Sequence, residues 1–423
     1  MAGTRAQWTV LTYIAAHNDL DEFGRRSLAE ILSVGSTPEV TLAVLFDGTQ
    51  GATRYVAGEP GTAALQEPLG EFDSGSPAGL LDTARWAFEE HPAERYALVL
   101  WSHGTGWRPE EIRQIARQTR GDASVDGAEA TERATRPGSL ALFRTTLARL
   151  LQPPTPAERA VLFDDGTSHS LDTLQLAEVV ADIAQIVGQP LDLLGMDACL
   201  MATLEVAYQV QPSVRYLVAS EELVPGFSWP YQDLYSQLRS NPSQSADRFA
   251  TNVVRHYTAY YAAHPPAVGD VTKVAVDVAH VDTVASAIDD LARTLSEDVE
   301  RYASVLWAAQ LACHKQESRG GTREPNKFRY HLWDIASLAG RLAGSDADAL
   351  ADSARQVAAT LGPGGPAVLA EGHYGDWFDG IGGLAVYLVP PNRYRISPAY
   401  AELALARDTH WATMLRAYHD EVA

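Results

Sequence analysis

A histidine and a cysteine, each placed where an apolar segment ends, are the residues of this chain best suited to covalent chemistry. His103 follows the apolar run 96–101 in Leu-Trp-Ser-His-Gly-Thr-Gly-Trp, and Cys199 follows the run 191–196 in Leu-Leu-Gly-Met-Asp-Ala-Cys-Leu-Met. If both runs are parallel strands, their carboxyl ends meet at one edge of a sheet, where such sheets bind ligands. A thiolate formed beside an imidazole is a nucleophile, so the pair predicts thiol-based catalysis.

The residues around this pair support the interpretation and leave one alternative open. The apolar spacing over 200–208 predicts a helix that begins just after Cys199, which would hold the sulfur at the positive end of a helix dipole. Gly104 would allow a substrate to approach closely and would direct an N–H toward a developing oxyanion. Taken alone, Cys199 is better explained as a small buried apolar side chain, as free cysteines commonly are.

The elements that must position these residues predict an α/β fold with a mainly parallel sheet. Runs rich in β-branched and aromatic residues at 8–14 and 40–46 flank a helical segment, which is the pattern of a βαβ unit. A serine followed by proline predicts a helix from 76 to 91, and an amphipathic pattern predicts another at 174–187. We therefore expect helices on both faces of the sheet.

The 423 residues are interpreted as a catalytic core over 1–240 and a C-terminal part over 241–423. Within the core, residues 108–160 hold many arginines, small polar residues and a Pro-Pro-Thr-Pro cluster, a composition that predicts a mobile insertion. The C-terminal part contains no concentrated polar motif. Its strands, expected at 271–276 and 384–389, are predicted to complete the sheet and support the site.

Charge and composition exclude several classes of protein. A formal net charge of -21 disfavours nucleic acid and anionic membranes as partners, and it would attract a cationic peptide. Only two cysteines occur, Cys199 and Cys313, too few for a disulfide framework or a multi-cysteine metal site. The first residues lack the apolar stretch of a signal peptide and no run reaches transmembrane length, so we expect a cytoplasmic protein.

Four blocks of the sequence resemble the clostripain-like cysteine peptidases of the caspase-fold clan. In chain order they are Trp8-Thr-Val-Leu-Thr-Tyr-Ile-Ala-Ala-His-Asn-Asp-Leu-Asp, Tyr96-Ala-Leu-Val-Leu-Trp-Ser-His-Gly-Thr-Gly-Trp, Met196-Asp-Ala-Cys-Leu-Met-Ala-Thr-Leu-Glu-Val-Ala-Tyr and Ala219-Ser-Glu-Glu-Leu-Val-Pro-Gly-Phe-Ser-Trp-Pro-Tyr. The resemblance implies a caspase-like sheet with a C-terminal α/β extension, and an endopeptidase that cuts after arginine or lysine. It implies that His103 helps generate the thiolate and protonates the leaving amine, while Cys199 forms an acyl-enzyme that water hydrolyses.

The resemblance also implies an acidic S1 pocket. Asp197 matches the family's pocket position two residues before the cysteine, although an acid that caps the following helix explains it equally well. Glu222, beside Glu221, could add negative potential, but adjacent surface glutamates are more often simply solvated. Trp229 could line a peptide cleft, whereas most tryptophans serve packing.

Members of this family are commonly zymogens cut between the histidine and the cysteine, which makes 108–160 a candidate activation loop. Five of its arginines are candidate processing sites, for the enzyme itself or for an upstream protease: Arg113, Arg117, Arg120, Arg133 and Arg136. The alternative is an ordinary basic loop lying against an acidic body. A latent intracellular protease would suit a pathway of stress response or antiviral defence.

The chemistry requires no cofactor, and calcium is expected only through the family resemblance. No EF-hand spacing occurs, and helix caps and turns account for most of the aspartates expected in loops: Asp19, Asp21, Asp47, Asp73, Asp164 and Asp165. The loop histidines His17, His169 and His373 have no Cys or His at ligand spacing, so the sequence assigns no metal ligand.

Other functions compete with the protease. A catalytically silent relative would use the cleft to bind peptides, and a transpeptidase would pass the same acyl-enzyme to an amine. A serine hydrolase, with His-Gly-Thr-Gly as its oxyanion loop, fails because the chain has no Gly-x-Ser-x-Gly elbow.

Overall fold

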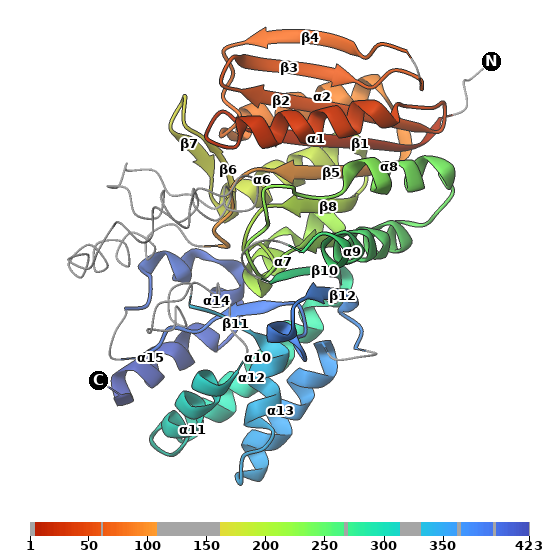
Figure 1. Ribbon diagram of the computed structural model, residues 1–423. Coiled ribbons are helices and arrows are strands. Elements are labelled where there is room, and N and C mark those ends of the chain that lie inside the picture. The colour runs from red at the N-terminus through yellow and green to blue at the C-terminus, as the bar shows by residue number, and fades with distance from the viewer. Residues whose placement is uncertain are drawn as a thin grey trace, which may run out of the picture.

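The computed structural model describes residues 5–60, 62–107, 161–265, 270–313, 331–361, 365–391 and 395–422. Its centre is a nine-stranded sheet in the order β12-β10-β9-β8-β5-β1-β2-β3-β4 (Figure 1). The predicted activation loop 108–160, with its five candidate processing arginines, lies outside the described residues.

The middle of the sheet is parallel, as predicted. Its five neighbouring strands are β9 (Val214–Ala219), β8 (Leu191–Asp197), β5 (Ala93–Trp101), β1 (Ala6–Ala15) and β2 (Val40–Gly48). Most of their residues are buried. Helices cover both faces of these strands, which explains why their sequences are continuous apolar runs and do not alternate with polar residues.

The two margins of the sheet are antiparallel. On one side β2 pairs with β3 (Gly51–Val56), which pairs with β4 (Leu65–Gly70). On the other side β9 pairs with β10 (Val271–Asp277), which pairs with β12 (Val368–Tyr374). Neither β4 nor β12 is evident from the sequence, because neither has a buried apolar run; β4 is exposed and contains Pro68, as suits an edge.

Helices pack on both faces of the sheet, as predicted (Figure 1). One face carries α1 (Asp21–Val34), α8 (Tyr231–Ser240) and α9 (Ala246–Ala263). The other carries α2 (Pro77–Glu90), α6 (Thr173–Val187) and α7 (Leu204–Val210).

The sequence indicates the start of α2 and both ends of α6. The Ser76 side chain caps α2 and Pro77 occupies its first turn. A reciprocal capping box of Asp172 and Gln175 starts α6, and Gly188, in the left-handed conformation at φ 75°, ends it.

The C-terminal part extends the sheet and adds a helical layer. Its helices are α10 (Val281–Glu297), α11 (Val299–Ala312), α12 (Ile335–Leu342), α13 (Asp348–Leu361), α14 (Ala404–Asp408) and α15 (Trp411–Val422). The predicted strand 271–276 joins the sheet as β10. The strand expected at 384–389 does not join it: only β13 (Ala385–Tyr387) forms, paired with β11 (Leu332–Asp334).

The remaining regular segments are short. Strands β6 (Val161–Asp164) and β7 (His169–Leu171) form a separate hairpin. The 3-10 helices are η1 (Gln211–Ser213), η2 (Val278–His280), η4 (Asp376–Phe378) and η5 (Pro398–Glu402). Among the described helices, none is both long and apolar enough to cross a membrane.

Candidate active site

Strand register brings His103 and Cys199 to the same place on the sheet. In the parallel pair of β5 and β8, Trp101 lies opposite Asp197, so His103 and Cys199 each stand two residues beyond the last paired position. The next residue confirms the proximity of the two segments, because a Cβ atom added to Gly104 would lie 2.5 Å from the carbonyl oxygen of Cys199. Only glycine permits this approach of the two backbones.

The imidazole of His103 is fixed by groups from neighbouring strands. Its Nε2 lies 2.9 Å from Oδ1 of Asp19, which follows β1, and its ring meets Phe163 edge to face at 5.9 Å between centroids. The ring is 1% exposed, whereas Asp19 is partly exposed. A carboxylate bonded to one imidazole nitrogen orients the ring and stabilises its protonated form. Sequence reasoning missed this role of Asp19, because the contact joins residues 84 positions apart.

Cys199 is buried, and its sulfur accepts a hydrogen bond from the backbone N–H of Val224 at 3.2 Å. The predicted helix after Cys199 is wrong. Helix α7 begins at Leu204, and the Thr203 side chain caps it. The intervening turn holds Leu200 at φ 67°, a left-handed conformation that is strained for a non-glycine residue. A helix dipole therefore does not act on the sulfur.

Lys273 supplies the positive charge that the helix was expected to provide. This lysine lies within β10, is 1% exposed, and its Nζ has no hydrogen-bond acceptor among the described residues. The ammonium instead lies over the rings of Tyr257 at 4.2 Å and Trp229 at 5.1 Å. Burial lowers the pKa of Lys273 to about 8, against the attraction of Asp197 and Cys199. The same attraction favours the thiolate of Cys199.

Asp197 is a buried strand end and does not cap a helix, so that interpretation is wrong. It is 3% exposed, and its Oδ2 accepts hydrogen bonds from the Ser228 hydroxyl, the Trp229 N–H at 3.1 Å and the Tyr231 hydroxyl at 2.8 Å. Its Oδ1 has no partner among the described residues. Burial raises the pKa of Asp197, and the charge of Lys273 opposes this rise.

The two glutamates after β9 are not solvated, contrary to the expectation from sequence. Each is 3% exposed. The carboxylate of Glu222 accepts the N–H of Leu223 at 2.8 Å. Its backbone carbonyl accepts the N–H of Leu200 at 3.3 Å, which ties this segment to the turn after Cys199. Burial, and then the carboxylate of Asp334, raise the pKa of Glu221 well above its usual value.

Trp229 lies in the core and is not on the wall of an open cleft. It is 0% exposed, a Cβ atom added to Gly195 would approach its ring to 2.7 Å, and the ring stacks on Tyr231 with 6.1 Å between centroids. Its ring also contacts the ammonium group of Lys273.

One group of side chains among the described residues can hold a metal ion, namely His17, Asp47 and Asp164. No local motif predicts this group, because the three residues come from segments far apart in the chain. Asp47 and Asp164 belong to strands β2 and β6, not to loops as expected. A nitrogen and two carboxylates suit Ca²⁺ poorly, since this ion prefers six to eight oxygen ligands. The calcium implied by the resemblance therefore has no matching ligand set in this group.

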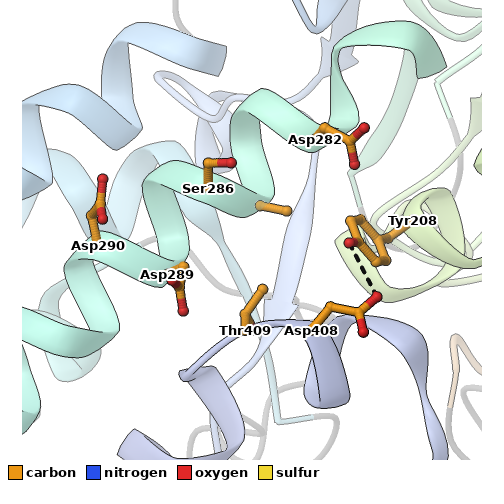
Figure 2. Close-up of a pocket in the computed structure, with 8 residues that line it drawn as sticks. Tyr208, Asp282, Ser286, Asp289, Asp290, Asp408 and Thr409 are labelled. Atoms are coloured by element: carbon orange, nitrogen blue, oxygen red, sulfur yellow. Dashed lines mark hydrogen bonds between the residues drawn. The ribbon is translucent and has the colours of Figure 1, made fainter.

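A surface pocket elsewhere is acidic but separate from these residues. Figure 2 shows it between α10 and the α14 region, with Tyr208 and four aspartates on its walls: Asp282, Asp289, Asp290 and Asp408. Three of the carboxylates bond to neighbouring elements, through Gln211 at 2.7 Å, His410 at 2.8 Å and Tyr208 at 3.3 Å. These contacts join α10 to η1 and to the segment after α14, and they join α14 to α7. The pocket contains neither His103 nor Cys199.

A caspase-like sheet with a histidine and a cysteine at the ends of adjacent strands defines a cysteine peptidase scaffold. The model of the clostripain family matches residues 12–127 and 151–342. The chain therefore belongs to the clostripain family of cysteine peptidases.

Individual relatives agree with this assignment. Clostripain from Hathewaya histolytica is 34% identical over 90 residues, which are 19% of this chain and 17% of that protein. Two solved structures have a TM-score of 0.63 at 18% identity, over 97% of this chain and 99% of theirs: a secreted C11 cysteine protease from Bacteroides thetaiotaomicron in complex with an irreversible peptide inhibitor, and an inactive zymogen C11 protease from Parabacteroides distasonis. At that identity the likeness concerns the fold, and it confirms the predicted caspase-like architecture.

Proposed function

We propose that this clostripain-family chain is a cysteine endopeptidase that cleaves after the basic residues arginine and lysine, through His103 and Cys199. One observation carries the proposal. The register of β5 and β8 brings the two residues to adjacent positions, and the Gly104 backbone lies against that of Cys199. A histidine and a thiol joined in this way are sufficient for acyl transfer.

The proposed reaction has two steps. The thiolate of Cys199 attacks the scissile carbonyl, and the N–H of Gly104 faces the resulting oxyanion. The C–N bond then breaks as protonated His103 donates its proton to the leaving amine. Because Nε2 faces Asp19, we assign proton transfer to Nδ1. Water, deprotonated by His103, then hydrolyses the thioester, and the acid product leaves while the thiol is restored. No cofactor takes part in these steps.

For the basic preference, we assign the S1 charge to Asp197 and Glu222. The unpartnered Oδ1 of Asp197 supports this assignment, because it offers an acceptor to a guanidinium or ammonium group. Lys273 partly neutralises Asp197, so Glu222 supplies the excess negative charge. We assign Trp229 to packing. The net charge of -21 favours the approach of basic substrates.

We further propose that the chain is a zymogen, activated by cleavage within 108–160 by itself or by an upstream protease. Support comes from burial, since His103 and Cys199 are 1% and 0% exposed and a substrate cannot reach them without local opening. The candidate bonds follow Arg113, Arg117, Arg120, Arg133 and Arg136. A cytoplasmic latent protease of this kind would act in stress response or antiviral defence.

The first test compares purified wild type with Cys199→Ala by intact mass and by hydrolysis of peptides that end in Arg, Lys or Asp. Self-activation predicts clipping within 108–160 in wild type only, and cleavage after Arg and Lys. Clipping of both proteins by added protease, followed by activity of wild type alone, indicates activation in trans. An inactive wild type after deliberate cleavage of 108–160 would favour the peptide-binding alternative.

The specificity is tested with Asp197→Asn. We expect kcat/KM for Arg peptides to fall about 10-fold or more, since a charged hydrogen bond is worth about 1.5–3 kcal/mol. Asp192→Asn is the matched control, because this buried aspartate lies at the opposite end of the same strand and pairs with Arg215. Equal losses in both variants would argue against Asp197 as the S1 acid. Product analysis with an added amine distinguishes hydrolysis from transpeptidation.

A further inference from the structure

We propose that His17, Asp47 and Asp164 form a binding site for a first-row transition-metal dication, with Zn²⁺ preferred to Mn²⁺. One ligand atom from each side chain lies within 4.8 Å of the others. His17 follows β1, Asp47 lies in β2 and Asp164 ends β6, so the site joins three separate segments. None of the proposed steps of peptide cleavage uses these residues.

Asp47 is the residue that points to a ligand. Its side chain is fully buried, and neither carboxylate oxygen accepts a hydrogen bond of normal geometry from a described residue. Burial raises the pKa of Asp47 to about 6, the adjacent Ser74 opposes the rise, and the Asp164 carboxylate adds to it. An unpaired buried carboxylate is costly, and a cation bound between the two acids would remove that cost.

The other two ligands are held in place without a metal. Asp164 receives the N–H of Gly166 at 2.8 Å on Oδ1 and that of Ser74 at 3.2 Å on Oδ2, which fixes its carboxylate. The imidazole of His17 lies on Gly166, where an added Cβ would come within 2.6 Å of Nδ1. This Nδ1 is 3.4 Å from Oδ1 of Asp164. Such preorganisation reduces the cost of binding an ion.

The donor set selects the metal. Imidazole nitrogen with two carboxylates suits Zn²⁺ and Mn²⁺, and Zn²⁺ in particular accepts three protein ligands with water in a fourth position. The side chain of His17 is 32% exposed, which leaves an open side from which the ion and its water can enter. Both aspartates are fully buried, so they would bind the ion from the protein interior.

The place of the site connects it with the dyad. Asp19, two residues after His17, bonds to His103. Asp164 ends β6, the first described strand after 108–160, and the N–H of Asp165 bonds to the carbonyl of His17 at 2.9 Å. A bound ion would link the loop that carries Asp19 to β6. Because the ion binds the folded chain, it should raise the free energy of unfolding.

The experiment uses the full chain with Cys199→Ala and His103→Ala, so that the dyad itself cannot bind Zn²⁺. Calorimetric titration with ZnCl2, MnCl2 and CaCl2 should give one Zn²⁺ per chain and a rise in Tm. Adding His17→Ala or Asp47→Asn should weaken Zn²⁺ binding at least 10-fold and abolish the rise, since loss of even an outer-shell partner commonly costs about 10–100-fold in affinity. Circular dichroism of the metal-free variants verifies that they fold.

Asp73→Asn is the matched control. This nearby carboxylate pairs with His169 at 2.6 Å and lies outside the site, so its loss should leave Zn²⁺ affinity unchanged. Three results would overturn the proposal: unchanged affinity in both site variants, loss of binding in Asp73→Asn alone, or Ca²⁺ binding tighter than Zn²⁺ and insensitive to His17→Ala. Because the tested protein lacks the dyad, these outcomes are independent of protease activity.

Discussion

The parallel strands β1, β5 and β8 bring Asp19, His103 and Cys199 to the site, whereas the antiparallel strand β10 and strand β11 bring Lys273 and Asp334 to its other side. Residues of the first group follow the carboxyl ends of strands and lie in the loops beyond them. Residues of the second group lie within strands and act through buried charge. Under the proposed mechanism, the parallel side of the site performs the bond chemistry, and the antiparallel side sets the charge of the groups that take part.

The strongest test of this division is Cys199→Ala, which should reduce kcat/KM by at least about 10³-fold, because the proposed acyl-enzyme forms on the Cys199 sulfur. The matched variant is Cys313→Ala, since this second buried cysteine ends α11 in the C-terminal part. It should change kcat/KM less than about 2-fold. The measurement is kcat/KM of both variants for hydrolysis of the same Arg peptide. A similar loss of kcat/KM in both variants would contradict the role of Cys199 as the nucleophile.

A smaller effect is expected from glycine substitutions on the two sides. Gly104→Ala places a methyl group 2.5 Å from the Cys199 carbonyl oxygen and should lower kcat about 10²-fold through misplacement of the site. Gly340→Ala in α12 meets nothing within 4 Å and should raise the free energy of unfolding by about 0.5–1 kcal/mol. Kinetics and chemical denaturation measure the two effects. Full activity of Gly104→Ala would contradict the close backbone contact.

Asp19→Asn should lower kcat about 10-fold to 100-fold with KM nearly unchanged, because the amide cannot stabilise the imidazolium of His103 as a carboxylate does. Glu22→Gln is the control for the loss of one negative charge on the same segment, and its kcat should stay within about 2-fold of wild type. Steady-state kinetics on one Arg peptide separates the two parameters. A change confined to KM would mean that Asp19 contacts substrate instead.

The smallest effect on turnover is expected for Lys273→Met, which should instead move the pH profile. In the folded chain Lys273 is charged below about pH 8, and this charge attracts the thiolate form of Cys199. Without this charge the thiolate is less favoured, so the acid limb of kcat/KM should shift to higher pH by about one unit. Activity at the optimum should fall only a few-fold. An unchanged acid limb would show that the C-terminal side does not control the ionisation of the nucleophile.

The sequence predicts the parallel strands and the places of His103 and Cys199, because continuous apolar runs and strand-end motifs are local signals. It does not predict the turn after Cys199. The apolar spacing there is compatible with a helix that begins earlier, but the Thr203 side chain caps α7 so that the helix begins at Leu204. Nor does it predict Lys273, although a single lysine in the apolar run Val271–Val276 was a usable sign. The group of His17, Asp47 and Asp164 has no local sign at all.

The position of residues 108–160 has a consequence for any cleaved form of the chain. A cut there assigns β1, β2, β3, β4 and β5 to one fragment and β6 onward to the other, so the sheet is divided along the single seam between β5 and β8. His103 then belongs to one polypeptide and Cys199 to the other. The mature enzyme would be a composite of two chains, and anything that parts the seam would separate the halves of its active site.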